Sequence, residues 1–258
     1  MAGALAEDAS VERGAALAAA ARCGACHGSP DGTAWSGGYA IETRFGTFYG
    51  PNLTSDPKTG IGGWTAVDFA TALRDGRDPA GRAYWPAFPY PSFTSLNDAD
   101  VADLWAFFQT LSAVEREDTA HALRGLWGWR GWLGPWRAMN LDRTPSPSMD
   151  RGEYLGTAVL HCGECHTPRG PTGGLRHRRE LGGNDDPPAP APDLTALGWD
   201  LDDWASFLED GLTPDDDLVG GEMRALIRQG TRTLSDADRR AIGAWVNGLP
   251  PVGRPPRK

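Results

Sequence analysis

Cysteine, methionine and long apolar runs are all scarce in this sequence. Its 258 residues include four cysteines and four methionines. No run of about 18 apolar residues occurs, so we expect no transmembrane helix, and membrane association only through partner proteins. The alanine-rich stretch 15–21 lacks a basic flank and a strongly apolar core. We therefore do not expect it to serve as a signal peptide.

Basic residues are also in the minority. The sequence has 25 Lys and Arg residues and 34 Asp and Glu residues, and the net charge is −9. This balance argues against nucleic acid and anionic membranes as general partners, and it favours a partner protein with a basic patch. The 34 glycines and 21 prolines indicate many turns, and the length allows one or two domains.

Two pentapeptides use all four cysteines. They are Cys23–His27, with the sequence CGACH, and Cys162–His166, with the sequence CGECH. A Cys-x-x-Cys-His motif is typical of covalent haem attachment, in which both thiols form thioethers and the histidine ligates the iron. One copy alone would equally fit half a zinc site or a thioredoxin-like redox pair. Two copies predict two covalently attached haem c groups, held by Cys23, Cys26 and His27 and by Cys162, Cys165 and His166.

The second half of the chain repeats the order of the first, which indicates two similar domains. Each motif is followed by Pro-x-Leu-Thr, by a helical pattern that ends at a glycine, and by a last helical pattern. We find no alternating pattern long enough for a sheet. The sequence therefore predicts an all-α fold of two tandem domains, residues 10–114 and 150–252, with a disordered tail at 253–258. The matched pairs include Pro51 and Pro192, Thr54 and Thr195, Trp64 and Trp199, Gly76 and Gly211, and Val114 and Val252.

Residues 115–149 form the predicted linker between these domains. One interpretation is a strap whose indole rings are buried against the domains. The other is a surface that docks on a membrane or a partner, because Trp and Arg favour interfaces. Glycines at 125, 128, 131 and 134 interrupt any amphipathic helix and favour the strap. The segment contains Arg124, Trp127, Trp129, Arg130, Trp132, Trp136 and Arg137.

Several longer segments carry a family resemblance. They are residues 45–54 (FGTFYGPNLT), 59–64 (TGIGGW), 84–90 (YWPAFPY) and 161–169 (HCGECHTPR). On these segments the chain resembles the bacterial two-haem cytochrome c family, and it is similar to the cytochrome c subunit of quinoprotein alcohol dehydrogenases. The resemblance implies two cytochrome c-like domains, a periplasmic location and redox partner proteins. The electron donor would be a dehydrogenase, and the acceptor a quinone or a terminal oxidase.

The resemblance also implies a methionine that closes the second iron from its far side. Met223 lies where the family pattern expects it, downstream of Trp199 and before the last helix. A methionine at such a position can also simply fill the core. An iron held by His166 and Met223 would change oxidation state without binding a substrate, as an electron carrier does.

The first haem lacks an equivalent methionine. None occurs in residues 2–138, and Phe88 stands at the position that matches Met223. Three alternatives stay open: a ligand from the linker, Met139 or less favourably His121; a tyrosine near Phe88; or an open iron under aromatic side chains. An open iron would make the chain a haem enzyme or a sensor of small molecules. Otherwise we expect an electron-transfer protein with no catalytic residue of its own.

Overall fold

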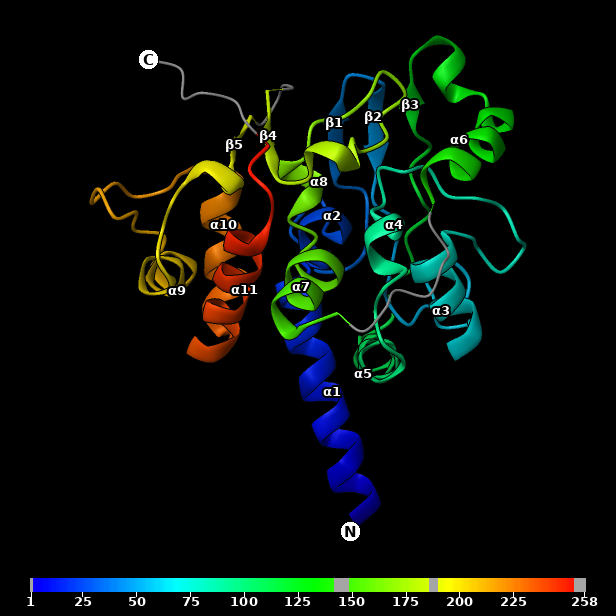
Figure 1. Cartoon of the computed structure of the whole chain (residues 1–258). Coiled ribbons are helices and arrows are strands. Elements are labelled where there is room, and N and C mark those ends of the chain that lie inside the picture. Colours follow the sequence, from blue (N-terminus) through cyan, green and yellow to red (C-terminus); the bar gives the residue numbers. More distant parts are fainter. Residues whose placement is uncertain (1, 142–148, 186–189, 253–258) are drawn as a thin grey trace. The chain divides into compact units, whose positions relative to one another are not determined.

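The computed structural model describes residues 2–141, 149–185 and 190–252, with side chains from residue 6 onward (Figure 1). The chain divides into two compact units, Met1–Ala138 and Met139–Lys258. The predicted tail and residues 142–148 of the predicted linker lie outside the described residues. Among the helices that are described, none is both long and apolar enough to cross a membrane.

Helices dominate the first unit. Helix α1 packs along α5, whose side chains Val101, Leu104 and Phe108 are buried. Two 3-10 turns, η1 (Gly125–Gly128) and η2 (Arg130–Trp132), precede the last helix. The α-helices are α1 (Ala2–Ala20), α2 (Cys23–His27), α3 (Ala66–Asp75), α4 (Tyr90–Phe93), α5 (Asp98–Gln109) and α6 (Leu133–Asn140).

A small antiparallel sheet, which the sequence did not lead us to expect, accompanies these helices. Its strand order is β1-β2-β3, with β1 at Ala40–Thr43, β2 at Gly46–Tyr49 and β3 at Ala122–Leu123. Strands of only two to four residues are too short to leave an alternating pattern in the sequence. The all-α prediction is corrected in this respect, although the fold is mostly helical.

The second unit is built in a similar way. Helix α11 packs against α7 and α9, and β4 (Gly182–Asn184) pairs with β5 (Ala191–Asp193) in a two-stranded sheet. The α-helices are α7 (Arg151–Tyr154), α8 (Gly163–His166), α9 (Leu201–Asp210), α10 (Gly221–Gln229) and α11 (Asp236–Gly248). A π-helical turn η3 (Leu155–Val159) and the 3-10 turns η4 (His177–Arg179), η5 (Leu194–Ala196) and η6 (Thr231–Thr233) complete it.

Matching helices in the two units begin and end alike. A capping box starts α3 at Thr65 and Asp68, and another starts α9 at Asp200 and Asp203. In such a box two side chains satisfy backbone N–H groups that the first helical turn leaves without a partner. Both helices end at glycines in the left-handed conformation, Gly76 (φ 57°) and Gly211 (φ 85°). The glycine that ends the first helical pattern is thus confirmed as a helix terminus.

A glycine also marks a close helix crossing in each unit. A Cβ atom on Gly14 of α1 would lie 1.9 Å from the backbone oxygen of Asp103 in α5. One on Gly152 of α7 would lie 1.9 Å from the backbone oxygen of Ala241 in α11. Only glycine permits so close an approach. In both units the helix that precedes the cysteine motif is thereby held against the helix that closes the repeat.

Part of the predicted linker packs onto the first unit. Leu133 and Trp136 of α6 are buried, and Trp127 lies edge-on to Phe45 with ring centroids 4.7 Å apart. Strand β3 lies in the same segment and pairs with β2. Because these aromatic side chains need apolar neighbours, the first compact unit extends past the predicted boundary at residue 114. Trp129 is different, since 66% of its surface is exposed.

Candidate functional site

Each Cys-x-x-Cys-His motif starts directly after a residue with a left-handed backbone. These residues are Arg22 (φ 52°) and His161 (φ 42°). Non-glycine residues seldom adopt this conformation unless the surrounding structure holds them in it. The reversal separates the preceding helical segment from the short helical turns α2 and α8, which carry the motif histidines. The two motifs therefore share one local backbone geometry.

A proline carbonyl holds the histidine of each motif. Nδ1 of His27 lies 2.9 Å from the carbonyl oxygen of Pro51, and Nδ1 of His166 lies 2.9 Å from that of Pro192. A carbonyl oxygen can only accept, so Nδ1 donates its proton and Nε2 keeps a lone pair. Burial lowers the pKa of both histidines, although the carbonyl contacts oppose this. A neutral imidazole oriented through Nδ1 is the form that ligates a metal.

A buried polar network fixes the loop that carries Pro51. The Asn52 backbone N–H donates to a carboxylate oxygen of Asp118 at 2.9 Å, and its Nδ2 donates to the carbonyl oxygen of Val114 at 2.8 Å. Its Oδ1 accepts from the N–H and the hydroxyl of Thr54 at 2.9 and 2.7 Å. Asn52 and Thr54 are both buried, so losing one partner would leave an unsatisfied polar group. The network thereby holds the Pro51 carbonyl in place.

The second unit repeats part of this network with an aspartate. Oδ1 of Asp193 accepts from the N–H and the hydroxyl of Thr195 at 2.9 and 2.6 Å. The Thr195 hydroxyl in turn accepts from the N–H of Val252 at 3.1 Å. The hydroxyl of Thr54 accepts from the N–H of Val114 at the same distance. Residues that match in the sequence therefore make matching contacts.

The thiols of the motifs do not resemble those of a redox pair. Burial, and next the neighbouring cysteine, raise the pKa of Cys23 to about 12 and that of Cys162 to about 12. Redox-active Cys-x-x-Cys pairs need a lowered thiol pKa. In the described parts of the chain no three His, Cys, Asp or Glu side chains gather as a metal-binding group. The two adjacent thiols and the oriented imidazole of each motif fit a covalently attached haem.

A hairpin with matching hydrogen bonds precedes each candidate position for a sixth iron ligand. The N–H of Tyr84 donates to the carbonyl of the glycine that ends α3 at 2.8 Å, and the N–H of Val219 donates to the glycine that ends α9 at 2.9 Å. Phe88 follows Tyr84 by four residues, and Met223 follows Val219 by four residues. Phe88 therefore occupies in the first unit the chain position that Met223, half-buried in α10, occupies in the second.

Phe88 lies in an aromatic cluster. Its ring centroid is 5.9 Å from that of Tyr84, 6.3 Å from that of Tyr90 and 5.7 Å from that of Phe93. Burial raises the pKa of the Tyr84 hydroxyl above its usual range, so this group stays protonated at neutral pH. A protonated phenol is a poor iron ligand. The segment thus offers aromatic rings where the second unit offers a thioether.

The two candidates from the predicted linker are placed unfavourably for iron ligation. Nδ1 of His121 accepts from the N–H of Tyr49 at 3.2 Å. The neutral ring of His121 therefore carries its proton on Nε2, the nitrogen that His27 keeps free. Met139 is 64% exposed and belongs to the second compact unit. His121 would have to turn over to bind iron, and the Met139 side chain lies largely at the surface.

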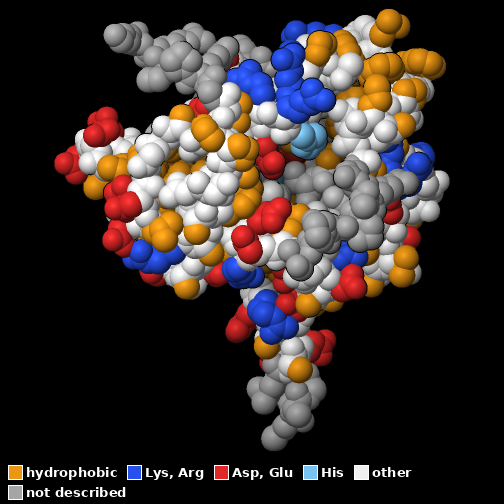
Figure 2. Space-filling model, viewed as in Figure 1, with side chains coloured by type: hydrophobic (Ala, Val, Ile, Leu, Met, Phe, Trp, Pro, Cys, Tyr) orange, Lys and Arg blue, Asp and Glu red, His pale blue; other side chains and the backbone are white. Residues whose placement is uncertain are grey.

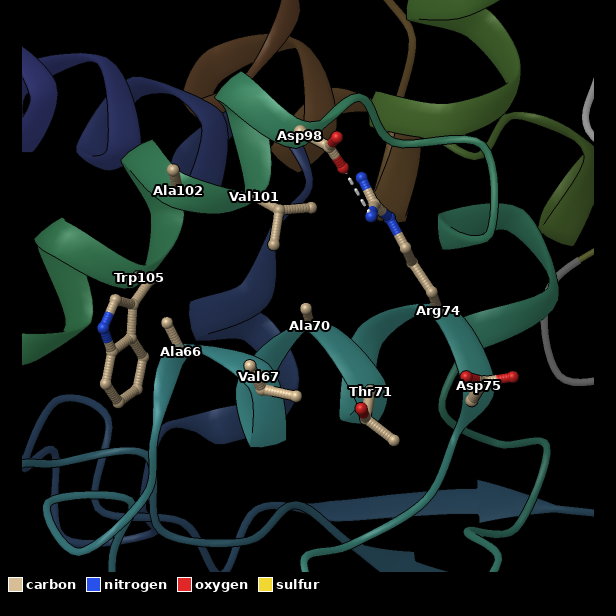
Figure 3. A pocket seen from close by; sticks show the side chains of 10 residues that line it. All are labelled: Ala66, Val67, Ala70, Thr71, Arg74, Asp75, Asp98, Val101, Ala102 and Trp105. Atoms are coloured by element: carbon tan, nitrogen blue, oxygen red, sulfur yellow. Dashed lines mark ion pairs between the residues drawn. The ribbon is translucent and has the colours of Figure 1, made fainter.

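A groove of about 390 Å³ lies between α3 and α5 in the first unit (Figure 3). Arg74 and Asp98 form an ion pair across it, with 2.7 Å between Nη1 and Oδ1. The lining contains no motif residue and none of the candidate iron ligands, so the groove is separate from the haem site. Most of the lining is apolar and consists of Ala66, Val67, Ala70, Val101, Ala102 and Trp105.

Comparison with known proteins identifies the family of this chain. The family model described as "Cytochrome c" matches residues 11–112, which include the first motif, Pro51 and Phe88. A relative from Cereibacter sphaeroides, described as "Diheme cytochrome c-type", is 39% identical over 93% of this chain and 86% of its own length. The chain belongs to the cytochrome c family. Its cofactor is haem c, and its function is electron transfer.

Other relatives are named as parts of dehydrogenases. "Alcohol dehydrogenase (quinone), cytochrome c subunit" of Gluconobacter oxydans is 37% identical over 96% of this chain and 56% of its own length. "Fructose dehydrogenase cytochrome subunit" of Gluconobacter japonicus is 34% identical over 93% of this chain and 53% of its own length. The chain thus spans about half the length of these two relatives. The resemblance to the cytochrome c subunit of quinoprotein alcohol dehydrogenases is confirmed.

Sequence reasoning missed the two groups that orient the motif histidines. The carbonyls of Pro51 and Pro192 are backbone groups, and every residue has one. The residue types alone therefore do not predict which carbonyl accepts from a motif histidine. A signal was present nevertheless, because Pro-x-Leu-Thr recurs after both motifs. A short repeat that contains a turn residue and a threonine indicates a loop that both halves of the chain use in the same way.

Proposed function

We propose that the chain is a dihaem c-type cytochrome that relays electrons from a periplasmic dehydrogenase to a downstream acceptor, a quinone or a terminal oxidase. The observation that carries this proposal is the repeated contact of a motif histidine with a proline carbonyl. It prepares one imidazole nitrogen in each unit to bind iron. With two haems in one chain, an electron can be held first by one haem and then by the other.

The roles of the residues follow from their positions. Haem iron, when bound, supplies the one-electron chemistry. His27 and His166 would hold the iron through Nε2, and the carbonyl at Nδ1 makes each imidazole more basic. Met223 would be the residue that closes the second iron, and a thioether there would keep small molecules away and raise the reduction potential. The attachment residues are Cys23 and Cys26 for the first haem, and Cys162 and Cys165 for the second.

Counting the haems tests this proposal directly. A pyridine haemochrome assay and the mass of the intact chain should both give two covalent haems per chain. The double variant Cys23→Ser, Cys26→Ser should retain one haem, and so should Cys162→Ser, Cys165→Ser, which is its matched control in the other unit. Fewer than two haems in the parent chain would contradict the proposal.

The names of the relatives as dehydrogenase subunits support a dehydrogenase as the electron donor. We expect the cytochrome to co-purify with such an enzyme from the periplasmic fraction. Addition of the enzyme's substrate should then reduce the haems, which the absorption bands of reduced haem c report. Haems that stay oxidised in a complex whose dehydrogenase turns over with an artificial acceptor would refute the relay.

One observation favours a second candidate function. Phe88 stands in the place of Met223, and residues 2–138 contain no methionine. A first iron without a sixth ligand would bind a small molecule, and the chain would then act as a haem enzyme or a sensor. Carbon monoxide added to the reduced protein separates the two functions. A spectral change in one haem per chain supports the open iron, and no change supports a plain electron carrier.

A further inference from the structure

A short hairpin starts at the glycine that ends α3 in the first unit and α9 in the second. We call residues 76–84 the first hairpin and residues 211–219 the second hairpin. Both are closed at matching positions by backbone hydrogen bonds of 2.8–3.0 Å, and each turns at a left-handed residue, Gly81 (φ 78°) or Asp216 (φ 62°). Because the two backbones match, their side chains and surroundings can be compared position by position.

The predicted linker covers the first hairpin. Ala83 packs against a buried cluster that consists of Phe48, Trp85 and Leu133. The carbonyl oxygen of Ala83 accepts a hydrogen bond from Nη2 of Arg130. Leu133 and Arg130 both belong to the linker, so one apolar side chain and one guanidinium group from outside the hairpin bind it.

Two leucines stand at the matching positions of the second hairpin. Leu212 pairs with Leu218 across it, as Arg77 pairs with Ala83 across the first. Side chains directly opposite each other in an antiparallel pair lie on one face. Leu212 is 39% exposed and Leu218 is 51% exposed, and we call them the leucine pair. The position that the linker covers in the first unit is therefore an exposed apolar face in the second.

Acidic residues flank the leucine pair. Three exposed aspartates, residues 215–217, form the tip of the second hairpin. The stretch around it, residues 190–223, contains ten Asp and Glu residues and no Lys or Arg. Figure 2 shows Asp and Glu side chains next to hydrophobic ones at the left of the view, where Figure 1 draws the loop between α9 and α10. The leucine pair is thus an apolar centre with a negatively charged rim.

We propose that the leucine pair and its acidic rim are the docking surface for a basic redox protein, one that presents an apolar side chain within a ring of Lys and Arg. Protein interfaces combine an apolar centre with a polar rim in this way, and complementary charge speeds up the encounter. The first unit supplies a precedent, because Leu133 and Arg130 bind the matching hairpin with the same combination of groups. The proposal rests on the electron-transfer function proposed above and adds where a partner binds.

The size and charge of the surface fit a transient redox partner. Electron-transfer encounters bury less than about 1,200 Å² in total, so a small apolar centre is enough. A second copy of this chain fits the surface less well, because the protein carries a net charge of −9 and like charges facing each other disfavour association.

The leucine pair lies near the helix that carries Met223. A Cβ atom on Gly211 would lie 3.8 Å from Cδ1 of Leu218 and 3.5 Å from Cδ1 of Ile227 in α10. Met223 belongs to the same helix. A protein docked on the leucine pair is therefore next to the helix with the candidate ligand of the second iron. We accordingly assign this surface to electron exchange with the second haem.

Stopped-flow electron transfer to a basic probe tests the leucine pair. The haem-loaded, reduced chain is mixed with oxidised mitochondrial cytochrome c, a basic protein, and each transfer oxidises one ferrous haem of the chain and reduces the ferric haem of the probe. The variant Leu212→Ser, Leu218→Ser should lower the second-order rate constant at low salt by about tenfold. Val67→Ser is the matched control, because Val67 is 73% exposed on α3. It should react as the parent does.

Removing charge tests the acidic rim. The rate constant of the parent should fall by about tenfold or more from low to physiological salt. Asp215→Asn, Asp217→Asn should lower the rate constant at low salt and flatten this salt dependence. Glu7→Gln, Asp8→Asn removes two charges from exposed positions of α1 and should keep it. All these positions are on the surface, so the variants should fold, which circular dichroism and the haem spectrum verify.

Three results would overturn the proposal. The first is a leucine-pair variant that reacts as fast as Val67→Ser. The second is a salt dependence that falls equally in the rim variant and in the α1 variant. The third is a parent that is dimeric in solution and becomes monomeric in the leucine-pair variant, because the surface would then bind a second copy. Fewer than two haems in the parent refute the electron-transfer proposal instead, so the haem count of the same samples distinguishes the two failures.

Discussion

Nδ1 of His27 lies 2.9 Å from the carbonyl oxygen of Pro51, and this contact decides which ring nitrogen can reach iron. The carbonyl requires a proton on Nδ1, so Nε2 stays available. His121 in the same unit has the opposite arrangement, because its Nδ1 accepts the backbone N–H of Tyr49. One histidine of this unit is therefore prepared for ligation and the other is not, although residue type alone makes them equal candidates.

Replacing Met223 should change the second haem. Met223→Leu keeps the volume and removes the thioether, so we expect the reduction potential of one haem to fall by on the order of 0.1 V, because axial ligands tune haem potentials over about 0.8 V. Spectroelectrochemical titration measures this. Met149→Leu is the control, since the Met149 sulfur accepts from the Thr157 hydroxyl at 3.7 Å and is no candidate iron ligand. Unchanged potentials in Met223→Leu would mean that this methionine only fills space.

Replacing Phe88 by methionine should make the first haem more like the second. Phe88→Met places a thioether at the chain position that matches Met223. We expect the potential of the first haem to rise and any binding of carbon monoxide to the reduced protein to disappear, because the sixth position is then filled. Phe107→Met is the control, since Phe107 packs on Trp35 and Phe108 instead. Carbon monoxide binding that persists in Phe88→Met would place the open position elsewhere.

Gly76→Ala should destabilise the first unit. Gly76 has φ 57°, and a Cβ atom there would lie 2.4 Å from the ring of the buried Tyr90. Backbone strain and overpacking together should lower the free energy of unfolding by about 3 kcal/mol. Gly81→Ala is the matched control, because Gly81 has φ 78° but open space around it. It should cost about 1 kcal/mol, and thermal unfolding of both variants measures the difference. Equal losses would show that contact with Tyr90 contributes nothing.

Asp103 should stabilise the packing of α1 on α5. Its carboxylate accepts from Nε and Nη2 of Arg13 at 2.6 and 2.9 Å and from the hydroxyl of Ser10. Asp103→Asn removes the charge from these contacts and should lower the unfolding midpoint by roughly 2–6 °C. Asp8→Asn, at an exposed position of α1, is a control that should shift it less. If Asp103→Asn lowers the unfolding midpoint no more than the control does, solvent screening cancels the contribution of the ion pair.

The same carboxylate should make stability depend on acidity. The hydrogen bond from Arg13 is the main reason why the pKa of Asp103 lies below its usual value. A group with a lowered folded-state pKa contributes its full stability above the unfolded-state pKa of about 3.9 and loses it as the pH falls through the folded-state value. The parent should thus lose stability below about pH 4 more steeply than Asp103→Asn. Parallel acid-unfolding curves would contradict this.

Helices with clear end signals were predictable from the sequence, and short strands were not. Thr65 and Gly76 bound α3 through side-chain capping and a left-handed turn, which act within one stretch of chain. Strand β3 comprises two residues and exists only because β2 lies beside it. The first unit extends past residue 114 for the same reason, since the burial of Trp136 depends on partners that are distant in the sequence.

Covalent chemistry was determined by the sequence itself. Two thiols and an imidazole that attach a haem are neighbours in the chain, so Cys23–His27 and Cys162–His166 identify the cofactor class before any fold is known. The repeat likewise pairs Phe88 with Met223 by position. Only the tertiary structure decided which nitrogen of His27 faces a carbonyl, and that Trp127 packs inward while Trp129 protrudes. These properties depend on which atoms of distant segments meet, and residue order alone does not specify such contacts.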